Sequence, residues 1–438
     1  MKSGDPIELE LDTLGPAGEG VGPHETRAVH VPGGFPGERV AARVTHVSRQ
    51  RPVAHAGLLR IITPHPGRRA SPCIHHDTGE PGKRKQPLCT GCPLLSLAVE
   101  DQRTHKMISL AREHGLQVDQ VVAAPAEFGY RFSSKRVVGG PPGNLVLGSY
   151  VRGTHTLAAM HACQVDHPEI VLAAEELRRV ADSLAIEAHD ENNEKTGTGD
   201  LRYAWFKTDG REVLLTLVTA SEDSRAAREL PERLRRPVGI AWSVQPSHGN
   251  SLRGRPAQVL RGQPELALEL AGVPLTTGPL GFLQPNPAVA ALAYADLVRG
   301  PDGVPLTGAL AFDLYAGAGV TTKLLRQHFT EVRPCEAYPE SAALLAVPPE
   351  TTEAFLQRQT ERPTLVIANP PRDGLGPQVC AELLRLAPPH LHIMSCGPAS
   401  LARDLAALAP KFRVVAIRAY DALPHTPHVE LVAWLAAT

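Results

Sequence analysis

The residues best suited to chemistry lie in the last third of the chain, in short motifs that follow apolar segments. The turn at 313–319 (DLYAGAG) follows an expected strand, and its glycines would let a ligand approach the backbone closely. Glu336, 17 residues after Gly319, stands where an acid can accept both ribose hydroxyls. A dinucleotide site would place a third glycine at position 322, which is Thr322. S-Adenosylmethionine carries no phosphate and needs no such glycine; the alternative is a tight turn that binds no ligand.

Two more motifs follow apolar strands. The segment 369–375 (NPPRDGL) begins with Asn369, and its two prolines make a stiff loop that can hold polar atoms beside a flat base and a methyl donor. The alternative is a Pro-rich connector. Cys396 lies between the strand LHIM and a helix, whose unpaired N–H groups and dipole favour a thiolate there. We expect Cys335 and Cys380, which lack this position, to be inert small apolar residues.

Glu430 lies inside the apolar segment HVELV (428–432). A carboxylate there costs free energy unless it is paired or used, and burial would raise its pKa toward that of a useful proton acceptor. Glu430 is therefore either an exposed residue of an edge strand or a general base. The residue pattern alone favours the exposed position.

Length and composition limit the class of protein. A chain of 438 residues, 42% hydrophobic and 21% charged, suits several globular domains and excludes a wholly disordered or fibrous protein. No run of about 18 apolar residues occurs, the N-terminus lacks a secretory signal, and seven cysteines argue against a disulfide framework, so we expect a cytoplasmic protein. Between Arg43 and Arg136, 15 Lys/Arg stand against 7 Asp/Glu, which indicates either a phosphate-binding surface or a solvated basic face.

The order of expected elements predicts three domains. Residues 1–62 alternate short strands with turns such as GPAGEGVGP (15–23), which is typical of a small OB-like β-barrel. Residues 63–275 mix strands with helices near 93–115 and 168–187, and 190–200 is a polar loop. From 276 to 438, strands alternate with helices, which predicts a Rossmann-like parallel α/β sheet with its ligands at the C-terminal strand ends.

The motifs, in their order along the chain, resemble the RNA 5-methyluridine (uracil-C5) methyltransferase family. The resemblance rests on FLQPN (282–286), the 313–319 turn, the acid at 336, NPPRDGL, SCGP (395–398) and HVE (428–430). The text GEGVGP…HVPGGFPGERVAARV is similar to the family's TRAM module, an RNA-binding β-barrel, and FGYRF (128–132) resembles its central domain. The match extends over nearly the whole chain. It implies a TRAM-like barrel at 1–62, then an α+β central domain at 63–275, then an S-adenosylmethionine-dependent methyltransferase domain at 276–438. Residues 93–125 are a candidate for packing on this catalytic domain.

The resemblance also assigns roles to single residues. It implies that Cys396 is a nucleophile and Glu430 a base, and that S-adenosylmethionine is bound at five positions: Gln284, Tyr315, Val320, Glu336 and Asn369. The reaction needs both groups, because uracil C5 becomes nucleophilic only after a thiolate adds to C6, and a base must then remove the C5 proton. The implied substrate is a uridine in RNA, 23S ribosomal RNA in the first place and transfer RNA as the alternative.

The four remaining cysteines occupy the positions where ribosomal-RNA members of the family ligate a [4Fe–4S] cluster. They are Cys73, Cys89, Cys92 and Cys163. Four soft ligands also suit tetrahedral zinc, which His75 and His76 keep as the runner-up, and four unlinked cysteines are the remaining alternative. The 15 residues between Cys73 and Cys89, which include the basic KRK at 83–85, form a longer loop than the family pattern suggests.

Two departures from the family favour a second hypothesis, a catalytically weakened RNA-binding paralogue. Asn369 stands where the family usually has Asp, and only 33 residues lead from Glu336 to Asn369. This length is too short for helix, strand, helix and strand. We therefore expect the first helix to be mostly lost, with LLAV (344–347) as the middle strand and TTEAFLQRQ as the next helix. No membrane segment and no need for a protein partner are evident.

Overall fold

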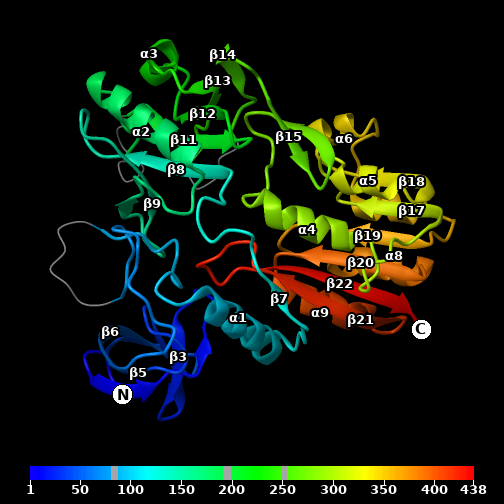
Figure 1. The fold of residues 1–438 in the computed structure, drawn as a ribbon, viewed down its shortest axis with the longest axis horizontal. Coiled ribbons are helices and arrows are strands. Elements are labelled where there is room, and N and C mark those ends of the chain that lie inside the picture. The colour runs from blue at the N-terminus through cyan, green and yellow to red at the C-terminus, as the bar shows by residue number, and fades with distance from the viewer. Residues whose placement is uncertain (80–86, 191–198, 248–253) are drawn as a thin grey trace. The chain divides into compact units, whose positions relative to one another are not determined.

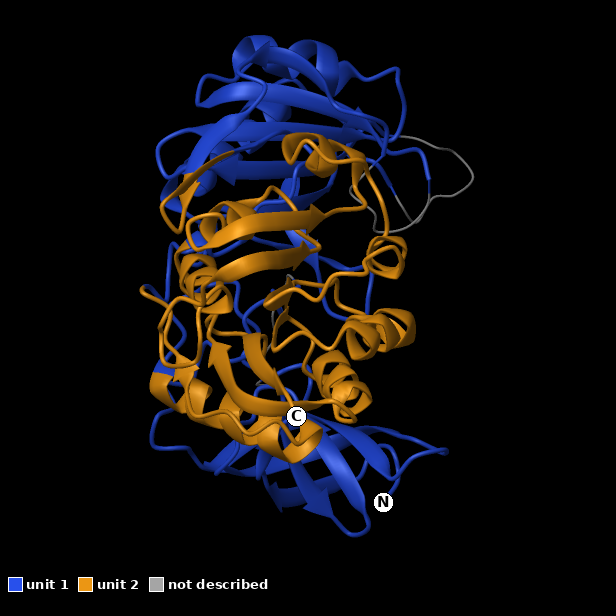
Figure 2. Cartoon of the chain, turned by 90° about the vertical axis from the view of Figure 1, so that its right-hand side faces the viewer, with its two compact units in different colours: residues 1–99, 126–268, 276–287 blue, residues 100–125, 269–275, 288–438 orange. Residues whose placement is uncertain are grey.

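The computed structural model describes residues 1–79, 87–190, 199–247 and 254–438. The basic KRK stretch and most of the expected 190–200 loop lie outside these ranges. The chain divides into two compact units (Figure 2). Unit 1 comprises residues 1–99, 126–268 and 276–287, and unit 2 comprises residues 100–125, 269–275 and 288–438. The expected division at 62 and 275 stays a prediction, since unit 1 contains both the N-terminal strands and the central region.

The N-terminal part of unit 1 is a sheet of six strands in the order β1-β5-β6-β4-β3-β2. The strands are β1 (Pro6–Glu10), β2 (Thr13–Leu14), β3 (Gly20–His24), β4 (Arg27–Val31), β5 (Arg39–Val47) and β6 (Val53–Thr63). Alternating side chains such as Ile7, Leu9 and Val29 are buried in one core, as the period of a strand requires. The segment expected to be a turn at 15–23 runs into strand β3, because Gly20 and Val21 pair with Val31 and His30.

The second part of unit 1 is a sheet of seven strands in the order β10-β9-β8-β11-β12-β13-β14. They are β8 (Ser133–Gly139), β9 (Val146–Tyr150), β10 (Leu157–Ala159), β11 (Leu201–Thr208), β12 (Val213–Thr219), β13 (Pro237–Val244) and β14 (Gln258–Gly262). Two helices, α2 (Pro168–Ser183) and α3 (Arg225–Arg233), pack their apolar residues into the core of this sheet. The division between the units falls within the two-stranded sheet of β15 (Leu266–Leu270) and β16 (Val273–Thr277).

Unit 2 is built on a seven-stranded sheet in the order β18-β17-β19-β20-β22-β21-β7 (Figure 1). The strands are β7 (Val121–Val122), β17 (Gly308–Leu314), β18 (Phe329–Cys335), β19 (Leu365–Ala368), β20 (His390–Ser395), β21 (Phe412–Tyr420) and β22 (Glu430–Ala437). Strands β18, β17, β19 and β20 are parallel, whereas β22 is antiparallel to both of its neighbours. The seven helices found here among the described residues are α1 (Val99–His114), α4 (Pro287–Leu297), α5 (Val320–Leu325), α6 (Pro339–Leu344), α7 (Thr352–Gln357), α8 (Gly376–Leu386) and α9 (Pro398–Leu408).

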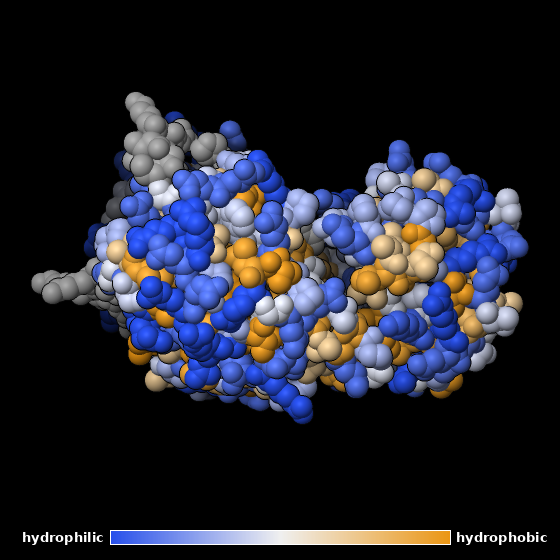
Figure 3. All heavy atoms as spheres, turned by 90° about the horizontal axis from the view of Figure 1, so that it is seen from above, coloured by the Kyte–Doolittle hydropathy of each residue, from blue (hydrophilic) through white to orange (hydrophobic). Residues whose placement is uncertain are grey.

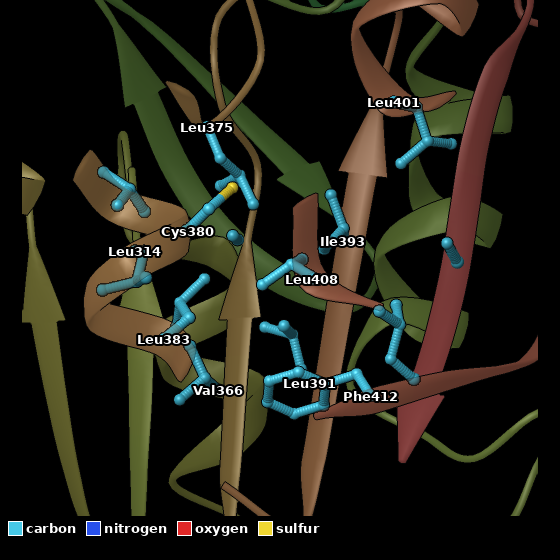
Figure 4. Packing of buried hydrophobic residues seen from close by; sticks show 14 of the residues in the cluster. Leu314, Val366, Leu375, Cys380, Leu383, Leu391, Ile393, Leu401, Leu408 and Phe412 are labelled. Atoms are coloured by element: carbon cyan, nitrogen blue, oxygen red, sulfur yellow. The ribbon is translucent and has the colours of Figure 1, made fainter. Parts of the chain in front are cut away.

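The core of unit 2 forms because the central strands are apolar on both faces. Every residue of β19 is buried, which is typical of a strand covered by helices on both sides of a parallel sheet. Leu383 of α8 and Leu401 of α9 pack against Val366 and Ile393 of the sheet (Figure 4). This packing holds the ends of β17, β19 and β20 at one edge of the sheet.

The short segment between Glu336 and Asn369 is folded differently from our expectation. A helix, α6, is present at 339–344, and residues 344–347 form no strand; α7 then follows at 352–357. The chain is therefore shortened by loss of the middle strand and not of the first helix. As a result, β18 is the outermost strand on this side of the sheet.

The exterior mixes side chains of both kinds. Hydrophilic and hydrophobic residues are interspersed over the face drawn in Figure 3. The most exposed large apolar side chains are Ile74, Phe282 and Leu344. Among the described residues, no helix has both the length and the apolar character needed to cross a membrane.

Candidate active site

Five residues singled out in the sequence meet at the C-terminal edge of the parallel strands of unit 2. The residue directly after each parallel strand belongs to the set: Glu336 after β18, Tyr315 after β17, Asn369 after β19 and Cys396 after β20. The neighbouring strand β22 begins with Glu430. The register places them in one row, because Leu314 pairs with both Cys335 and Ala368. Such an edge is where ligands bind in open α/β sheets.

The glycine turn after β17 needs unusual backbone conformations. Gly319 has a φ of +79°, and a Cβ added there would lie 2.6 Å from the Leu345 side chain. It is followed at once by α5, so the turn directs the start of this helix toward the sheet edge. Tyr315 is not a glycine but has a φ of +59°, a conformation that costs about 1–3 kcal/mol and is often found at functional sites.

Glu336 is fixed by the same turn. One carboxylate oxygen accepts the N–H of Gly317 at 2.8 Å, and the other accepts the N–H of Tyr338 at 2.8 Å. A carboxylate oxygen can accept more than one hydrogen bond, so both oxygens retain capacity to accept ribose hydroxyls. The carboxylate is therefore oriented before any ligand binds.

A second acid, Asp313, lies beneath the turn. Its side chain is buried and accepts hydrogen bonds from the hydroxyls of Thr321, at 2.8 Å, and Thr322, at 2.5 Å. Burial raises the pKa of Asp313 to about 6, although the two threonine hydroxyls oppose this shift. Thr322, noted in the sequence as the missing third glycine, thus ties α5 to the end of β17.

The loop that begins at Asn369 is held from two sides. The N–H of Asn369 donates to the carbonyl of Leu314 at 3.3 Å, next to the glycine turn. At the other end, the buried Asp404 of α9 accepts the N–H of Leu375 at 2.7 Å. Gly374 has a φ of +84°, and a Cβ there would lie 2.3 Å from Asp404, so no other residue fits this position without a shift. The loop is rigid because of these contacts as well as its prolines.

Cys396 and Glu430 lie opposite each other. The last pair of the antiparallel β20–β22 ladder is Ser395 with Leu431, and Cys396 and Glu430 are the next residues outward, on the rung that would continue it. They are close enough for the charge of Glu430 to raise the pKa of the Cys396 thiol. Residues directly opposite in such a ladder point to the same face, with Cβ atoms about 4.5–5.5 Å apart. Both side chains are half-buried. A thiol and a carboxylate are thus neighbours at the sheet edge.

The electrostatics of this pair differ from our expectation of a thiolate. Burial raises the pKa of the Cys396 thiol, and the charge of Glu430 raises it further. The N-terminus of α9, where Gly397 is the N-cap and no side chain caps the helix, does not outweigh the effect of burial on this thiol. Burial likewise raises the pKa of Glu430 to about 7.

Arg372 is a member of the site to which the sequence analysis gave no role. Its guanidinium is a hydrogen-bond partner of Cys396 and lowers the pKa of that thiol, and its charge also lowers the pKa of Glu430. Arg372 is exposed and lies in the NPPRDGL loop. Its place three residues after Asn369, in a loop already assigned to the site, is the signal that could have identified it.

The other three residues assigned to S-adenosylmethionine have different surroundings. Burial raises the pKa of Tyr315 to about 12, and its hydroxyl has Thr352 of α7 as a partner. The Val320 side chain is buried in the core, so this residue can reach a ligand only through its backbone. Gln284 lies in unit 1, in the segment before α4, where the neighbouring Pro285 carbonyl accepts the N–H of Phe132 at 2.8 Å.

The four cysteines of unit 1 line one cavity, which we call the thiol pocket: Cys73, Cys89, Cys92 and Cys163. The cavity has a volume of about 50 Å³, and His75, His76 and Arg131 also line it. The backbone joins two of its walls, because the N–H of Cys89 donates to the carbonyl of His75 at 2.6 Å. Within the ranges that the structure describes, no three or more His, Cys, Asp or Glu residues are arranged as a ready-made site for a metal ion.

Burial and two arginines have opposite effects on the thiols of the pocket. Burial raises the thiol pKa of Cys73, Cys89 and Cys92, and the nearby thiol of Cys163 adds to this shift. Two arginines oppose it: Arg131 lowers the pKa of Cys92, and Arg136 lowers that of Cys89. The Nε of Arg131 is buried without a hydrogen-bond partner. Arg136 already forms a buried ion pair with Asp166, so Arg131 is the cation to which metal-bound thiolates would bring negative charge.

Comparison with known proteins agrees with this architecture. No protein-family model matches the chain. In the solved structures, the tRNA (uracil-54, C5)-methyltransferase of Pyrococcus abyssi in complex with S-adenosyl-L-homocysteine has a TM-score of 0.75 and 24% identity, and the match covers 98% of this chain and 100% of that one. The protein therefore has a mixed α/β methyltransferase fold with an N-terminal sheet of strands.

Curated relatives define the family. An uncharacterized RNA methyltransferase of Geobacter sulfurreducens is 31% identical over an alignment of 464 positions, which covers 99% of this chain and 90% of that protein. Another uncharacterized RNA methyltransferase, from Thermosynechococcus vestitus, is 30% identical, and the alignment covers 99% of this chain and 98% of that protein. The chain belongs to this family of RNA methyltransferases.

Proposed function

We propose that this RNA methyltransferase transfers a methyl group from S-adenosylmethionine to C5 of a uridine, through a covalent bond between Cys396 and uracil C6. The observation that carries the proposal is the Cys396–Glu430 rung at the C-terminal sheet edge. Methylation of an exocyclic nitrogen or a ribose oxygen needs no thiol, whereas C5 of uracil needs a nucleophile and a base together. The Pyrococcus abyssi protein with the same fold is named for uracil C5 chemistry, which supports this assignment.

The residues in the row beyond β18, β17 and β19 would hold the methyl donor. Glu336 is oriented to accept ribose hydroxyls, Tyr315 follows the neighbouring strand β17, and Asn369 follows β19 beyond it. We assign Gln284 and the backbone of Val320 to the same role. S-Adenosylmethionine, when bound, supplies an electrophilic methyl group, and the amide of Asn369 can both donate and accept hydrogen bonds beside it.

Cys396 and Glu430 act in sequence. The thiolate of Cys396 forms a bond to C6, and the C5–C6 π electrons move toward C5. C5 then bonds to the methyl carbon while that carbon's bond to the sulfonium sulfur of the donor breaks and leaves its electron pair on the sulfur. Glu430 as carboxylate accepts the C5 proton, and the electron pair of that C–H bond restores the C5–C6 double bond and expels the Cys396 thiolate. Arg372 supports the first step because it lowers the pKa of Cys396. A pKa of about 7 suits Glu430 for the second step at neutral pH.

The test is methyl transfer from a labelled donor to separated RNA fractions. We expect the wild type to label uridine C5, and Cys396→Ala to give no label above background. Cys380→Ala is the matched control, because Cys380 is a buried core cysteine of α8 and should leave labelling intact. No label above the Cys396→Ala level with any RNA would leave the alternative of a weakened RNA-binding paralogue, which Asn369 and the lost middle strand favour.

We assign 23S ribosomal RNA as the substrate, with transfer RNA as the competitor. The N-terminal sheet, which we interpret as a TRAM-like RNA-binding module, and the four cysteines support ribosomal RNA through the family resemblance. The name of the Pyrococcus abyssi relative supports transfer RNA. The two fractions in the same assay decide between them, since only the true substrate should reach one methyl group per molecule.

For the thiol pocket we propose a [4Fe–4S] cluster, with zinc as the alternative. Four soft thiol ligands line one cavity, and Arg131 and Arg136 stabilise the thiolate form of two of them. Protein purified without oxygen should contain about four irons per chain and absorb broadly near ~400 nm. Stoichiometric zinc without iron would overturn the cluster in favour of the alternative.

A further inference from the structure

Helix α1 buries two polar side chains inside unit 2, which is unusual for a helix of a small sheet domain. Gln102, Lys106 and Leu110 are its buried residues, spaced four apart, so they form one stripe along the helix. Leu110 enters the apolar core, as expected. Gln102 and Lys106 must instead find polar partners, because an unpaired buried amide or ammonium is costly.

Lys106 finds its partners at both ends of the segment 421–429, which joins β21 to β22 and which we call the base loop. Its Nζ lies 2.5 Å from Oδ1 of Asp421 and 3.4 Å from the carbonyl oxygen of His428. The Lys106 and Asp421 side chains are each 1% exposed, so this is a fully buried ion pair. His428 is two residues before Glu430.

Gln102 holds the middle of the base loop. Its amide oxygen accepts the backbone N–H of His425 at 2.9 Å, and its amide nitrogen lies 3.1 Å from Nδ1 of the same residue. His425 is completely buried and has a φ of +68°. The amide of Gln102 therefore secures a backbone conformation that a histidine rarely adopts.

Tyr420, the residue before the loop, pairs with Glu430, the residue after it, so the loop closes on the rung that carries the base. We infer that Lys106 and Gln102 are positioning residues that hold the Glu430 carboxylate opposite Cys396. This inference rests on the proposed function, because it assigns a catalytic purpose to contacts that would otherwise contribute only to stability.

The order of the chemical steps gives the inference a specific signature. Glu430 acts only after Cys396 has bonded to C6 and C5 has been methylated. If the carboxylate is displaced, bond formation by Cys396 should continue, whereas proton removal and release of the RNA should slow. The covalent protein–RNA adduct should then accumulate. A variant that is merely unstable would lose adduct and turnover together.

The experiment uses the full chain with Lys106→Met and Asp421→Leu combined. Removing both partners avoids leaving one buried charge unpaired, and such apolar replacements of buried ion pairs are often tolerated. We expect a melting temperature close to that of the wild type, turnover reduced roughly tenfold to a hundredfold, and a stronger adduct band on a denaturing gel with RNA and methyl donor. Gln102→Leu, which leaves the ion pair intact, should give the same pattern to a smaller extent.

Two further variants make the outcome decisive. Arg103→Met removes a cation from the same helix whose partner is Glu100, and it should leave turnover and adduct unchanged. Glu430→Gln is the benchmark for a missing base and should accumulate adduct. If Glu430→Gln gives none, the proposed function fails. If Glu430→Gln accumulates adduct but the Lys106/Asp421 and Gln102 variants show the wild-type band, or lose the band together with turnover, the positioning role is overturned.

Discussion

Cys396 in unit 2 and the thiol pocket in unit 1 share one physical property and differ in another. In both places burial raises the pKa of a thiol that we expect to act as a thiolate. Cys396, however, directly follows a strand and meets one carboxylate at the start of the neighbouring strand and one guanidinium from a rigid loop. The pocket cysteines come from irregular segments and meet mainly one another. In the proposed function, a regular ladder fixes a single thiol for ordered bond and proton transfers, whereas loops gather several thiols that a shared cation would hold as thiolates.

Replacing Cys396 or Cys163 by serine has the largest expected effects and tests whether the two cysteine sites act independently. Cys396→Ser should lower methylation of RNA more than about a thousandfold, because a hydroxyl is a far weaker nucleophile at neutral pH, and should leave the metal content unchanged. Cys163→Ser should lower the iron content of the protein while Cys396 still reacts with iodoacetamide at the wild-type rate. Metal analysis and peptide mass spectrometry measure both. Loss of iron in Cys396→Ser would show that the two sites are not separate in function.

The pH dependence of turnover tests whether Glu430 acts as the base. Glu430 must be ionised to accept a proton, and its pKa is raised to about 7, so activity should rise with pH through this value. Turnover should increase about tenfold from pH 6 to pH 8, in the same direction as ionisation of the Cys396 thiol. In Glu430→Gln the step near pH 7 should disappear, and a rate that still rises there would assign the ionisation to another group.

Arg372 gives the smallest of the three effects. Removing its guanidinium in Arg372→Leu should raise the pKa of Cys396 further and slow alkylation of this thiol roughly threefold to tenfold at pH 7.5, the effect of half to one pKa unit. Arg403→Leu is the matched control, because Arg403 donates to the carbonyl of Asp373 in the same loop. Equal slowing in both variants would mean that the loop, and not the charge of Arg372, controls the thiol.

The sequence predicts the parts of this site that depend on local order. Each of Tyr315, Glu336, Asn369 and Cys396 directly follows a strand of the parallel part of the sheet, and parallel strands necessarily bring such residues to one edge. The assignment of the glycine turn as the start of a helix likewise needs only neighbouring residues, and α5 begins directly after Gly319.

Features that depend on long-range pairing were not predictable in the same way. Nothing local in the sequence indicates that β22 inserts between β20 and β21. This order places Glu430 across from Cys396. Glu430 is therefore half-buried, whereas the residue pattern alone favoured an exposed strand. The prediction of a middle strand at LLAV (344–347) was wrong, because this segment has a strand-like composition but pairs with no strand of the sheet. The partners of Gln102 and Lys106 lie in the last part of the chain, and helical periodicity cannot name them.

The shared rung of Cys396 and Glu430 also limits how this region can change in evolution or in engineering. Successive side chains of a strand alternate between the faces of the sheet, so Glu430 can have its proposed role only while the parity of β22 against β20 is preserved. One residue inserted into the strand would turn the carboxylate toward the opposite face, even if the apolar core adapted. An insertion of two residues would restore the face but would move the carboxylate about 6.6 Å along the strand, so β22 should tolerate no change of length between Glu430 and its paired residues.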